Sequence, residues 1–200
     1  YRYADDELVY LWDNADAVAV VFHGAFVPTI ERIRDRVGRV RTWLWVDDGS
    51  GPCPDWATPY EGVAASHPDR VVPPWGRSGD HLYMLYTGGT TGMPKGVMWR
   101  QDDLIRNLVG SAVDPTVREG EPDYETVRAR VTGPGMVGLP ACPLMHGTGC
   151  FTQLIVLSQG GSVVTLESRS LDVPELLDTI EREGVNLIAI VGDAFAKPIN

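Results

Sequence analysis

The sequence has 200 residues, 44% of them hydrophobic and 22% charged, which is typical of a globular chain with a buried core and excludes a disordered protein. Its 27 acidic and 17 basic residues give a formal net charge of −10, so we expect neither a nucleic-acid partner nor attraction to anionic membranes. A small anionic ligand is still allowed, because a local group of backbone amides can overcome the field of the whole chain.

The cysteines and the apolar runs indicate the compartment. Three cysteines, Cys53, Cys142 and Cys150, form no C-x-x-C pair, which disfavours a disulfide framework or a zinc site and favours small buried side chains in a reducing cytoplasm. No apolar run approaches the roughly 20 residues of a membrane span, and no signal peptide is visible. We therefore expect a cytoplasmic location without integral membrane association.

Helices and strands alternate along residues 1–120, the first predicted lobe. Acidic residues in the first turn and Leu8, Leu11 and Trp12 on one face predict a helix over 5–14. Further elements are expected in this order: a strand over 17–22, a helix over 28–37 ended by Gly38, a strand over 42–46, a loop over 48–54, a weaker helix over 55–66, irregular structure over 67–80, a strand over 81–86 and a helix over 101–110.

Proline and glycine punctuate residues 121–135, where we place a linker to a second lobe over 136–200. There the pattern predicts strands over 136–142, 162–166 and 186–191 and helices over 147–158 and 172–183. Asp172 and Glu175 form a candidate capping box for the last helix, Gly184 ends it, and Leu176, Leu177 and Ile180 form its apolar face.

These unbroken apolar strands, separated by helices, predict an α/β fold with parallel sheets covered on both faces. The chain begins at Tyr1 close to a predicted helix and ends at Asn200 after a predicted strand. We expect both ends to be cuts through a longer protein.

The most informative segment, YTGGTTGMPKGV over residues 86–97, follows the strand predicted at 81–86. Its glycines let backbone amides approach phosphate oxygens and form an anion-binding nest, its threonines add hydroxyl donors, and Lys95 adds a positive charge. The segment is not a Walker A loop, which requires G-x-x-x-x-G-K-S/T, because Pro94 precedes the lysine and Gly96 follows it. A second glycine pattern, G-x-G-x-x-G over 133–138, is interpreted as a loop entering a strand, since Pro140 and Pro143 prevent a dinucleotide-binding helix.

Residues 87–96 resemble, position by position, the signature phosphate loop of the adenylate-forming superfamily, S/T-S/G-G-S/T-T-G-x-P-K-G. Gly88 stands where many members have serine, which removes a hydroxyl but keeps the amide. The resemblance implies that the loop binds the β- and γ-phosphates of ATP through Thr87, Gly88, Gly89, Thr90, Thr91, Gly92 and Lys95, with Lys95 also counted as catalytic.

Residues 143–149, PLMHGTG, resemble the P-L/M-x-H-x-x-G segment of acyl- and aryl-CoA ligases. The resemblance implies that His146 lies near the substrate carboxylate and the adenylate phosphate as a catalytic and substrate-binding residue, and that Gly149 borders the acyl pocket. Residues 191–195, VGDAF, are similar to a segment beside the acyl site of bacterial fatty-acyl and steroid side-chain CoA ligases, which makes Gly192 a candidate contact. A helix start capped by Asp193 explains the same residues equally well.

The resemblance implies the N-terminal domain of an AMP-forming acyl-CoA synthetase, which uses ATP, Mg²⁺, a carboxylic acid and coenzyme A. No Y-G-x-T-E segment, no T-G-D segment and no C-terminal domain with its lysine is found, so the family's Mg²⁺-assisting Glu and ribose-binding Asp are missing. We therefore expect the isolated chain to be inactive. Two alternatives stay open: an adenylation domain that loads a carrier protein, and a fold unit without catalysis.

Overall fold

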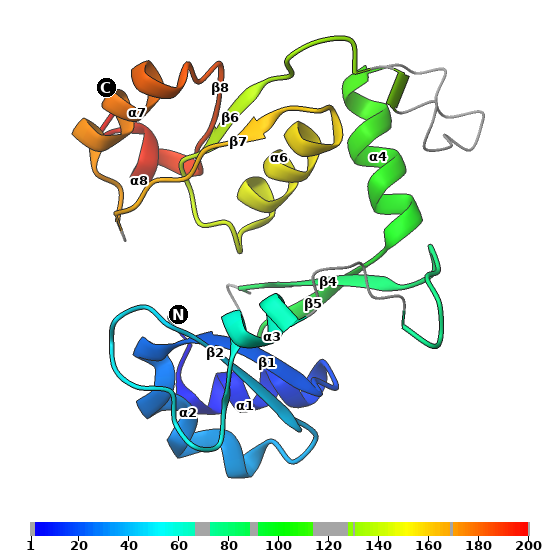
Figure 1. The fold of residues 1–200 in the computed structure, drawn as a ribbon, viewed down its shortest axis with the longest axis vertical. Coiled ribbons are helices and arrows are strands. Elements are labelled where there is room, and N and C mark those ends of the chain that lie inside the picture. Colours follow the sequence, from blue (N-terminus) through cyan, green and yellow to red (C-terminus); the bar gives the residue numbers. More distant parts are fainter. Residues whose placement is uncertain are drawn as a thin grey trace. The chain divides into compact units, whose positions relative to one another are not determined.

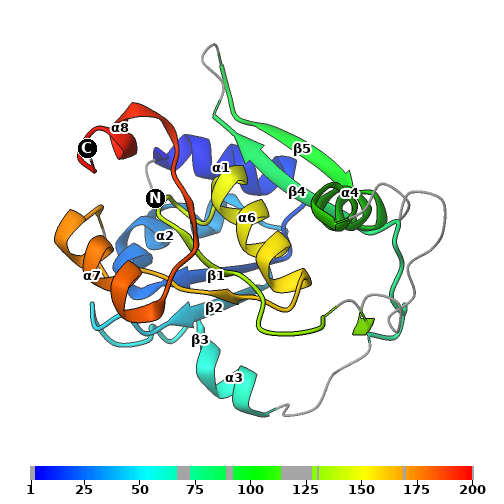
Figure 2. The ribbon, with the colours of Figure 1, turned by 90° about the horizontal axis from the view of Figure 1, so that it is seen from above.

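The computed structural model describes residues 3–66, 73–88, 92–113, 128–129, 131–168 and 170–199. The chain forms two compact units, one of Tyr1–Ser78 with Met84–Met98 and one of Gly79–Tyr83 with Trp99–Asn200. Each contains a parallel sheet and helices (Figures 1 and 2), which confirms the predicted α/β class. The predicted division into 1–120, 121–135 and 136–200 stays a prediction, because most of 121–135 lies outside the described residues.

The first unit carries a three-stranded parallel sheet in the order β1-β2-β3, with Ala19 opposite Thr42 and Leu44 opposite Thr58. Its elements are α1 (Asp5–Asn14), β1 (Ala19–His23), η1 (Gly24–Phe26), α2 (Val27–Ile33), η2 (Arg34–Arg36), β2 (Thr42–Val46), β3 (Thr58–Pro59) and α3 (Tyr60–Ser66). The helix predicted over 28–37 is α-helical only to Ile33 and continues as a 3₁₀ turn. The helix predicted over 55–66 begins at Tyr60, because the residues directly before it form β3, which pairs with β2.

Aromatic side chains fill the core of the first unit. Trp43 of β2 meets Trp12 of α1 edge to face with ring centroids 5.7 Å apart, and Phe22 of β1 stacks on Trp56 at 5.6 Å. The buried members of this core are Val20, Phe22, Ile30, Val37, Trp43 and Trp45.

The helices α1 and α2 both contribute to this core, through Trp12 and Ile30. On the other face of β1, the described part of the chain leaves Val21 56% exposed, so coverage of that face stays a prediction.

A two-stranded sheet joins β4 (Leu82–Thr87) to β5 (Lys95–Arg100), which α4 (Gln101–Val113) follows directly. The carbonyl of His81 accepts a hydrogen bond from the Gln101 amide at 2.9 Å, and the Thr87 hydroxyl meets the Lys95 carbonyl at 3.4 Å. The strands therefore run in opposite directions as a hairpin, and its connection carries the predicted phosphate loop.

The second unit is a β-α-β-α-β arrangement with parallel strand order β7-β6-β8. Its elements are β6 (Val137–Pro140), α6 (Gly147–Ser158), β7 (Ser162–Val163), α7 (Val173–Glu183), β8 (Leu187–Ala189) and α8 (Gly192–Ala196). Both faces of β6 are covered, as predicted. A Cβ on Gly138 would lie 2.7 Å from Val156 of α6, while Leu139 packs with Leu176 of α7.

The ends of α7 agree with the sequence. Asp172 accepts a hydrogen bond from the Glu175 amide at 3.0 Å, and Gly184 adopts φ +63° after the last turn. The second half of the predicted capping box is wrong, because the Glu175 carboxylate accepts instead from the Glu167 amide at 2.7 Å. Of the predicted apolar face, Leu176 is fully buried and Ile180 packs against the same core, whereas Leu177 is 52% exposed.

The glycine pattern at 133–138 runs as a loop into β6, which confirms that it is not a dinucleotide-binding turn. Among the helices in the described ranges, none is long and apolar enough to cross a membrane.

Candidate functional site

The predicted phosphate loop connects two strands of one hairpin. Thr87 ends β4, and Lys95 begins β5. A Walker A loop connects a strand to a helix, so this setting agrees with the rejection of that motif. Gly89, Thr90 and Thr91 lie outside the described residues, and the predicted nest of amides is therefore described only at its two ends.

Those two ends present polar groups. The Thr87 hydroxyl donates to the Lys95 carbonyl at 3.4 Å, which joins the strands at the base of the loop. Gly92 has φ +143°, a conformation that L side chains rarely adopt, and a Cβ on Gly88 would meet nothing within 4 Å. Pro94 is buried beside the exposed Lys95, so the chain is anchored directly before the ammonium-bearing residue.

Two tyrosines of β4 fix the hairpin, and the sequence did not predict either contact. Tyr86 donates to Oδ1 of Asn14, the last residue of α1, at 2.6 Å in the first unit. The Tyr83 hydroxyl forms a hydrogen bond with Sγ of Cys150, a residue of α6 in the second unit, at 2.9 Å. Burial and this hydrogen bond raise the pKa of Tyr83 to about 12, and burial also raises the pKa of Tyr86, so both phenols are neutral at pH 7.

His146 caps the N-terminus of α6. Its backbone is extended, at φ −81° and ψ 141°, and its Nδ1 accepts a hydrogen bond from the Thr148 amide at 3.2 Å. An accepting Nδ1 carries no proton, so the neutral ring carries its proton on Nε2. The imidazole is exposed, which leaves Nε2 available as a donor.

Gly149 lies in the first turn of α6, where another chain segment approaches closely. A Cβ at this position would lie 2.7 Å from the carbonyl oxygen of Pro143 and 3.2 Å from Sγ of Cys142. The same Pro143 carbonyl accepts from the His146 amide at 2.9 Å. Gly149 therefore permits the turn that leads into His146.

We expect Gly149→Ala to lower the free energy of unfolding by about 1–3 kcal/mol, because the added methyl meets a backbone atom that cannot rotate away. Chemical denaturation of the variant measures this loss. Gly38→Ala is the control, because its added methyl has nothing within 4 Å. Gly184→Ala is unsuitable, since the positive φ at that position strains any side chain. Equal stability of the Gly149 and Gly38 variants would contradict the prediction.

Gly192 is the first residue of α8, with φ +64°. The alternative interpretation, in which Asp193 caps this helix, is wrong. Asp193 lies within the first turn and pairs with Lys197 at 3.0 Å, and Val191 occupies the capping position. Because β6 and β8 are parallel neighbours, the segments that hold His146 and Gly192 both leave the carboxyl edge of the same sheet, where α/β proteins bind ligands.

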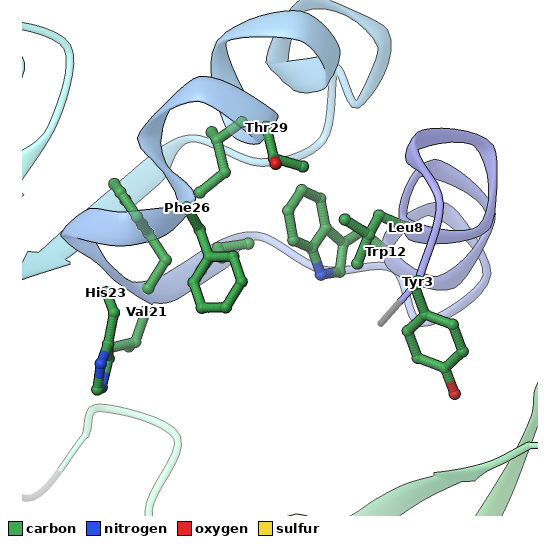
Figure 3. A pocket seen from close by; sticks show the side chains of 10 residues that line it. Tyr3, Leu8, Trp12, Val21, His23, Phe26 and Thr29 are labelled. Carbon is green, nitrogen blue, oxygen red and sulfur yellow. The ribbon is translucent and has the colours of Figure 1, made fainter. Parts of the chain in front are cut away.

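The predicted site residues thus form two groups. Thr87, Gly88, Gly92 and Lys95 belong to the hairpin in the first unit, and His146, Gly149 and Gly192 belong to the second unit. A separate pocket of about 290 Å³ lies in the first unit between α1, β1 and α2, lined by aromatic residues such as Trp12 and Phe26 (Figure 3). None of the predicted site residues lines this pocket.

Cysteine, histidine and acidic side chains are the groups of this chain that could ligate a metal ion. All three cysteines are free thiols, two of them buried as predicted, and burial raises the pKa of Cys142. Among the residues that the structure describes, no group of three or more His, Cys, Asp or Glu side chains could hold a metal ion.

The chain is similar to curated acyl-CoA ligases. It is 38% identical to the medium-chain acyl-CoA ligase Mig of Mycobacterium avium and 36% identical to a medium/long-chain-fatty-acid and 3-oxocholest-4-en-26-oate CoA ligase of Mycobacterium tuberculosis. Each alignment covers 100% of this chain and 36% of the relative, so the chain spans about a third of the length of these proteins.

Solved structures share the fold. The N-terminal domain of FACL13 from Mycobacterium tuberculosis matches with a TM-score of 0.71 and 19% identity, over 99% of this chain and 43% of that one. The o-succinylbenzoate CoA synthetase MenE from Bacillus subtilis, solved with its acyl-adenylate intermediate, matches with a TM-score of 0.64 and 19% identity, over 99% and 43%. The sequence profile described as AMP-binding enzyme matches residues 1–199, and the chain therefore belongs to the AMP-binding enzyme family.

Proposed function

We propose that this chain is part of an AMP-forming acyl-CoA ligase. In the first step a carboxylate oxygen attacks the α-phosphorus of ATP, the bond from that phosphorus to the bridging oxygen breaks, and pyrophosphate leaves. In the second step the coenzyme A thiolate attacks the acyl carbon, and AMP leaves as the thioester forms. The observation that carries the proposal is the phosphate-loop signature at the turn of the β4–β5 hairpin in a chain of this family.

In this proposal the hairpin binds the phosphates that leave as pyrophosphate. The Thr87 hydroxyl and the exposed Lys95 ammonium flank the connection between the strands, and Gly88 and Gly92 let the backbone approach oxygen atoms without a side chain between them. Gly89, Thr90 and Thr91 complete the proposed set of ligands. Lys95 counters the negative charge that grows on the leaving group.

The second group acts on the acyl end. With Nδ1 occupied by the Thr148 amide, Nε2 of His146 is the nitrogen that donates a hydrogen bond to the carboxylate or to the adenylate phosphate. Gly192 presents backbone without a side chain at the same sheet edge, and nothing lies within 4 Å of a Cβ added there, which leaves room for an acyl group. Gly149 is assigned to the border of the acyl pocket through the turn that it permits before His146. These roles are proposed for the intact protein.

Mg²⁺ fits this site only as a partner of the nucleotide, because the described residues offer no carboxylate cluster that would hold it alone. When bound, it would neutralise part of the negative charge of the phosphates. The ammonium of Lys95 would supply positive charge to the same phosphates from this chain, and Thr87 would hold the base of the loop through its hydrogen bond to the Lys95 carbonyl.

We assign a fatty or steroid side-chain acid as the substrate class, because the names of the two mycobacterial relatives include such acids. Both names also include CoA, which favours coenzyme A over a carrier protein as the acceptor. A cytoplasmic location accords with the three free thiols.

The proposal is tested by expressing the complete coding sequence and measuring pyrophosphate exchange into ATP with medium-chain, long-chain and steroid side-chain acids, followed by thioester formation with coenzyme A. Acid-dependent exchange together with an acyl-CoA product is expected. Exchange without any acyl-CoA would favour the carrier-protein alternative, and no exchange with any acid would favour the fold unit without catalysis. The 200-residue chain alone is expected to catalyse neither step.

A further inference from the structure

We infer that Tyr86 is a positioning residue, which holds the phosphate-loop hairpin through its hydrogen bond to Asn14. The inference rests on the proposed function of the loop. Tyr86 directly precedes Thr87, and its hydroxyl donates to Oδ1 of Asn14 at 2.6 Å. This contact joins residues 72 positions apart in the sequence and ties β4 to the end of α1.

The ring of Tyr86 also contacts the other strand of the hairpin. A Cβ on Gly96 would lie 3.1 Å from Cζ of Tyr86 and 2.9 Å from Sδ of Met84, so the absence of a side chain at Gly96 makes room for the ring. Gly96 directly follows Lys95. Tyr86 therefore adjoins both described ends of the loop. It directly precedes Thr87, and its ring lies against Gly96, the residue after Lys95.

The hydroxyl fixes where that ring lies. Without the Asn14 contact the ring still packs against Gly96, but the hydrogen bond that ties β4 to the end of α1 is lost. A binding group displaced by about 1 Å loses much of its effect on a bound phosphate, because charge-assisted hydrogen bonds depend steeply on distance and angle. The Tyr86 phenol is a protonated donor across the neutral range, since burial raises its pKa further above the ordinary value near 10.

The test replaces the hydroxyl and its acceptor separately in the full-length protein. Tyr86→Phe and Asn14→Ala are each expected to raise the KM for ATP by about 3- to 10-fold, the loss of one hydrogen bond, while the KM for the acid and the melting temperature stay unchanged. The double variant is expected to lose no more than either single variant, because both remove the same contact. Tyr60→Phe, at an exposed tyrosine in the same unit, is the matched control and is expected to leave all three values unchanged.

A second readout needs no ATP. Hydrogen–deuterium exchange at the amides of the described loop ends is expected to be several-fold faster in Tyr86→Phe than in the wild type, with α7 unaffected. These amides are those of Thr87, Gly88, Gly92, Met93, Lys95 and Gly96. Unchanged exchange at these amides, or losses that add up in the double variant, would overturn the inference. If the wild-type protein shows no pyrophosphate exchange, the proposed function fails. Hydrogen–deuterium exchange at the loop amides still decides whether Tyr86 positions the hairpin.

Discussion

Replacing Lys95 with alanine is expected to lower kcat/KM for ATP in the full-length protein by about 10²- to 10³-fold. The ammonium is the cationic side chain at the described base of the phosphate loop, and removing one preorganised donor from a developing negative charge has effects of this size. Pyrophosphate exchange at varied ATP concentration measures the loss. The KM for the acid is expected to stay close to its wild-type value, because Lys95 is assigned to the phosphates.

The sequence provides its own control for this experiment. Lys95 and Lys197 are its two lysines, and all other basic residues apart from histidine are arginines. Lys197 directly follows α8, is exposed and pairs with Asp193 of that helix, so Lys197→Ala is expected to change the activity little. If the Lys95→Ala enzyme is as active as the Lys197→Ala enzyme, Lys95 does not bind the phosphates.

Leu176→Ala is expected to weaken the second unit by about 2–5 kcal/mol. Leu176 is fully buried and packs with Leu139 and Ala141, so truncation leaves a cavity between α7 and β6. Because this chain alone already forms two compact units, the local free energy is best measured by hydrogen exchange at the amides of α7 under native conditions.

The neighbouring residue is the control. Leu177→Ala makes the same chemical change at a side chain that is 52% exposed, and its expected effect is below about 0.5 kcal/mol. Similar losses in the two variants would mean that the described packing of α7 is wrong.

Local rules explain which features could be predicted from the sequence. Asp172 and Gly184 were identified as the ends of α7 because capping involves only residues close in the chain. The extents of β2 and α6 also agree with their predictions over 42–46 and 147–158. The parallel pairing followed from the alternation of apolar strands with helices.

Features that depend on distant residues were not predictable. Leu177 has the composition of a core residue, and only the packing of α7 on β6 determines that Leu176 is buried instead. Glu175 has the right spacing for a capping box, yet the loop amide of Glu167 is a competing donor. Nothing local to Tyr86 indicates that its partner is Asn14, which lies 72 residues earlier in the chain.

The site residues divide in the same way. The loop between Thr87 and Lys95 could be recognised because its glycines, threonines and lysine are contiguous. The orientation of His146 could not, because it follows from the hydrogen bond between Nδ1 and the Thr148 amide. The close approach that makes Gly149 necessary depends on the carbonyl of Pro143, a packing contact that spacing alone does not reveal.

Protection of Lys95 by ATP is the most direct test of the proposed phosphate site. The full-length protein is labelled with an amine-reactive reagent in the presence and absence of ATP and Mg²⁺, and the labelling rates at Lys95 and Lys197 are compared by mass spectrometry. ATP is expected to slow the labelling of Lys95 several-fold and to leave that of Lys197 unchanged. Equal labelling of Lys95 with and without saturating ATP would mean that the loop does not bind the phosphates.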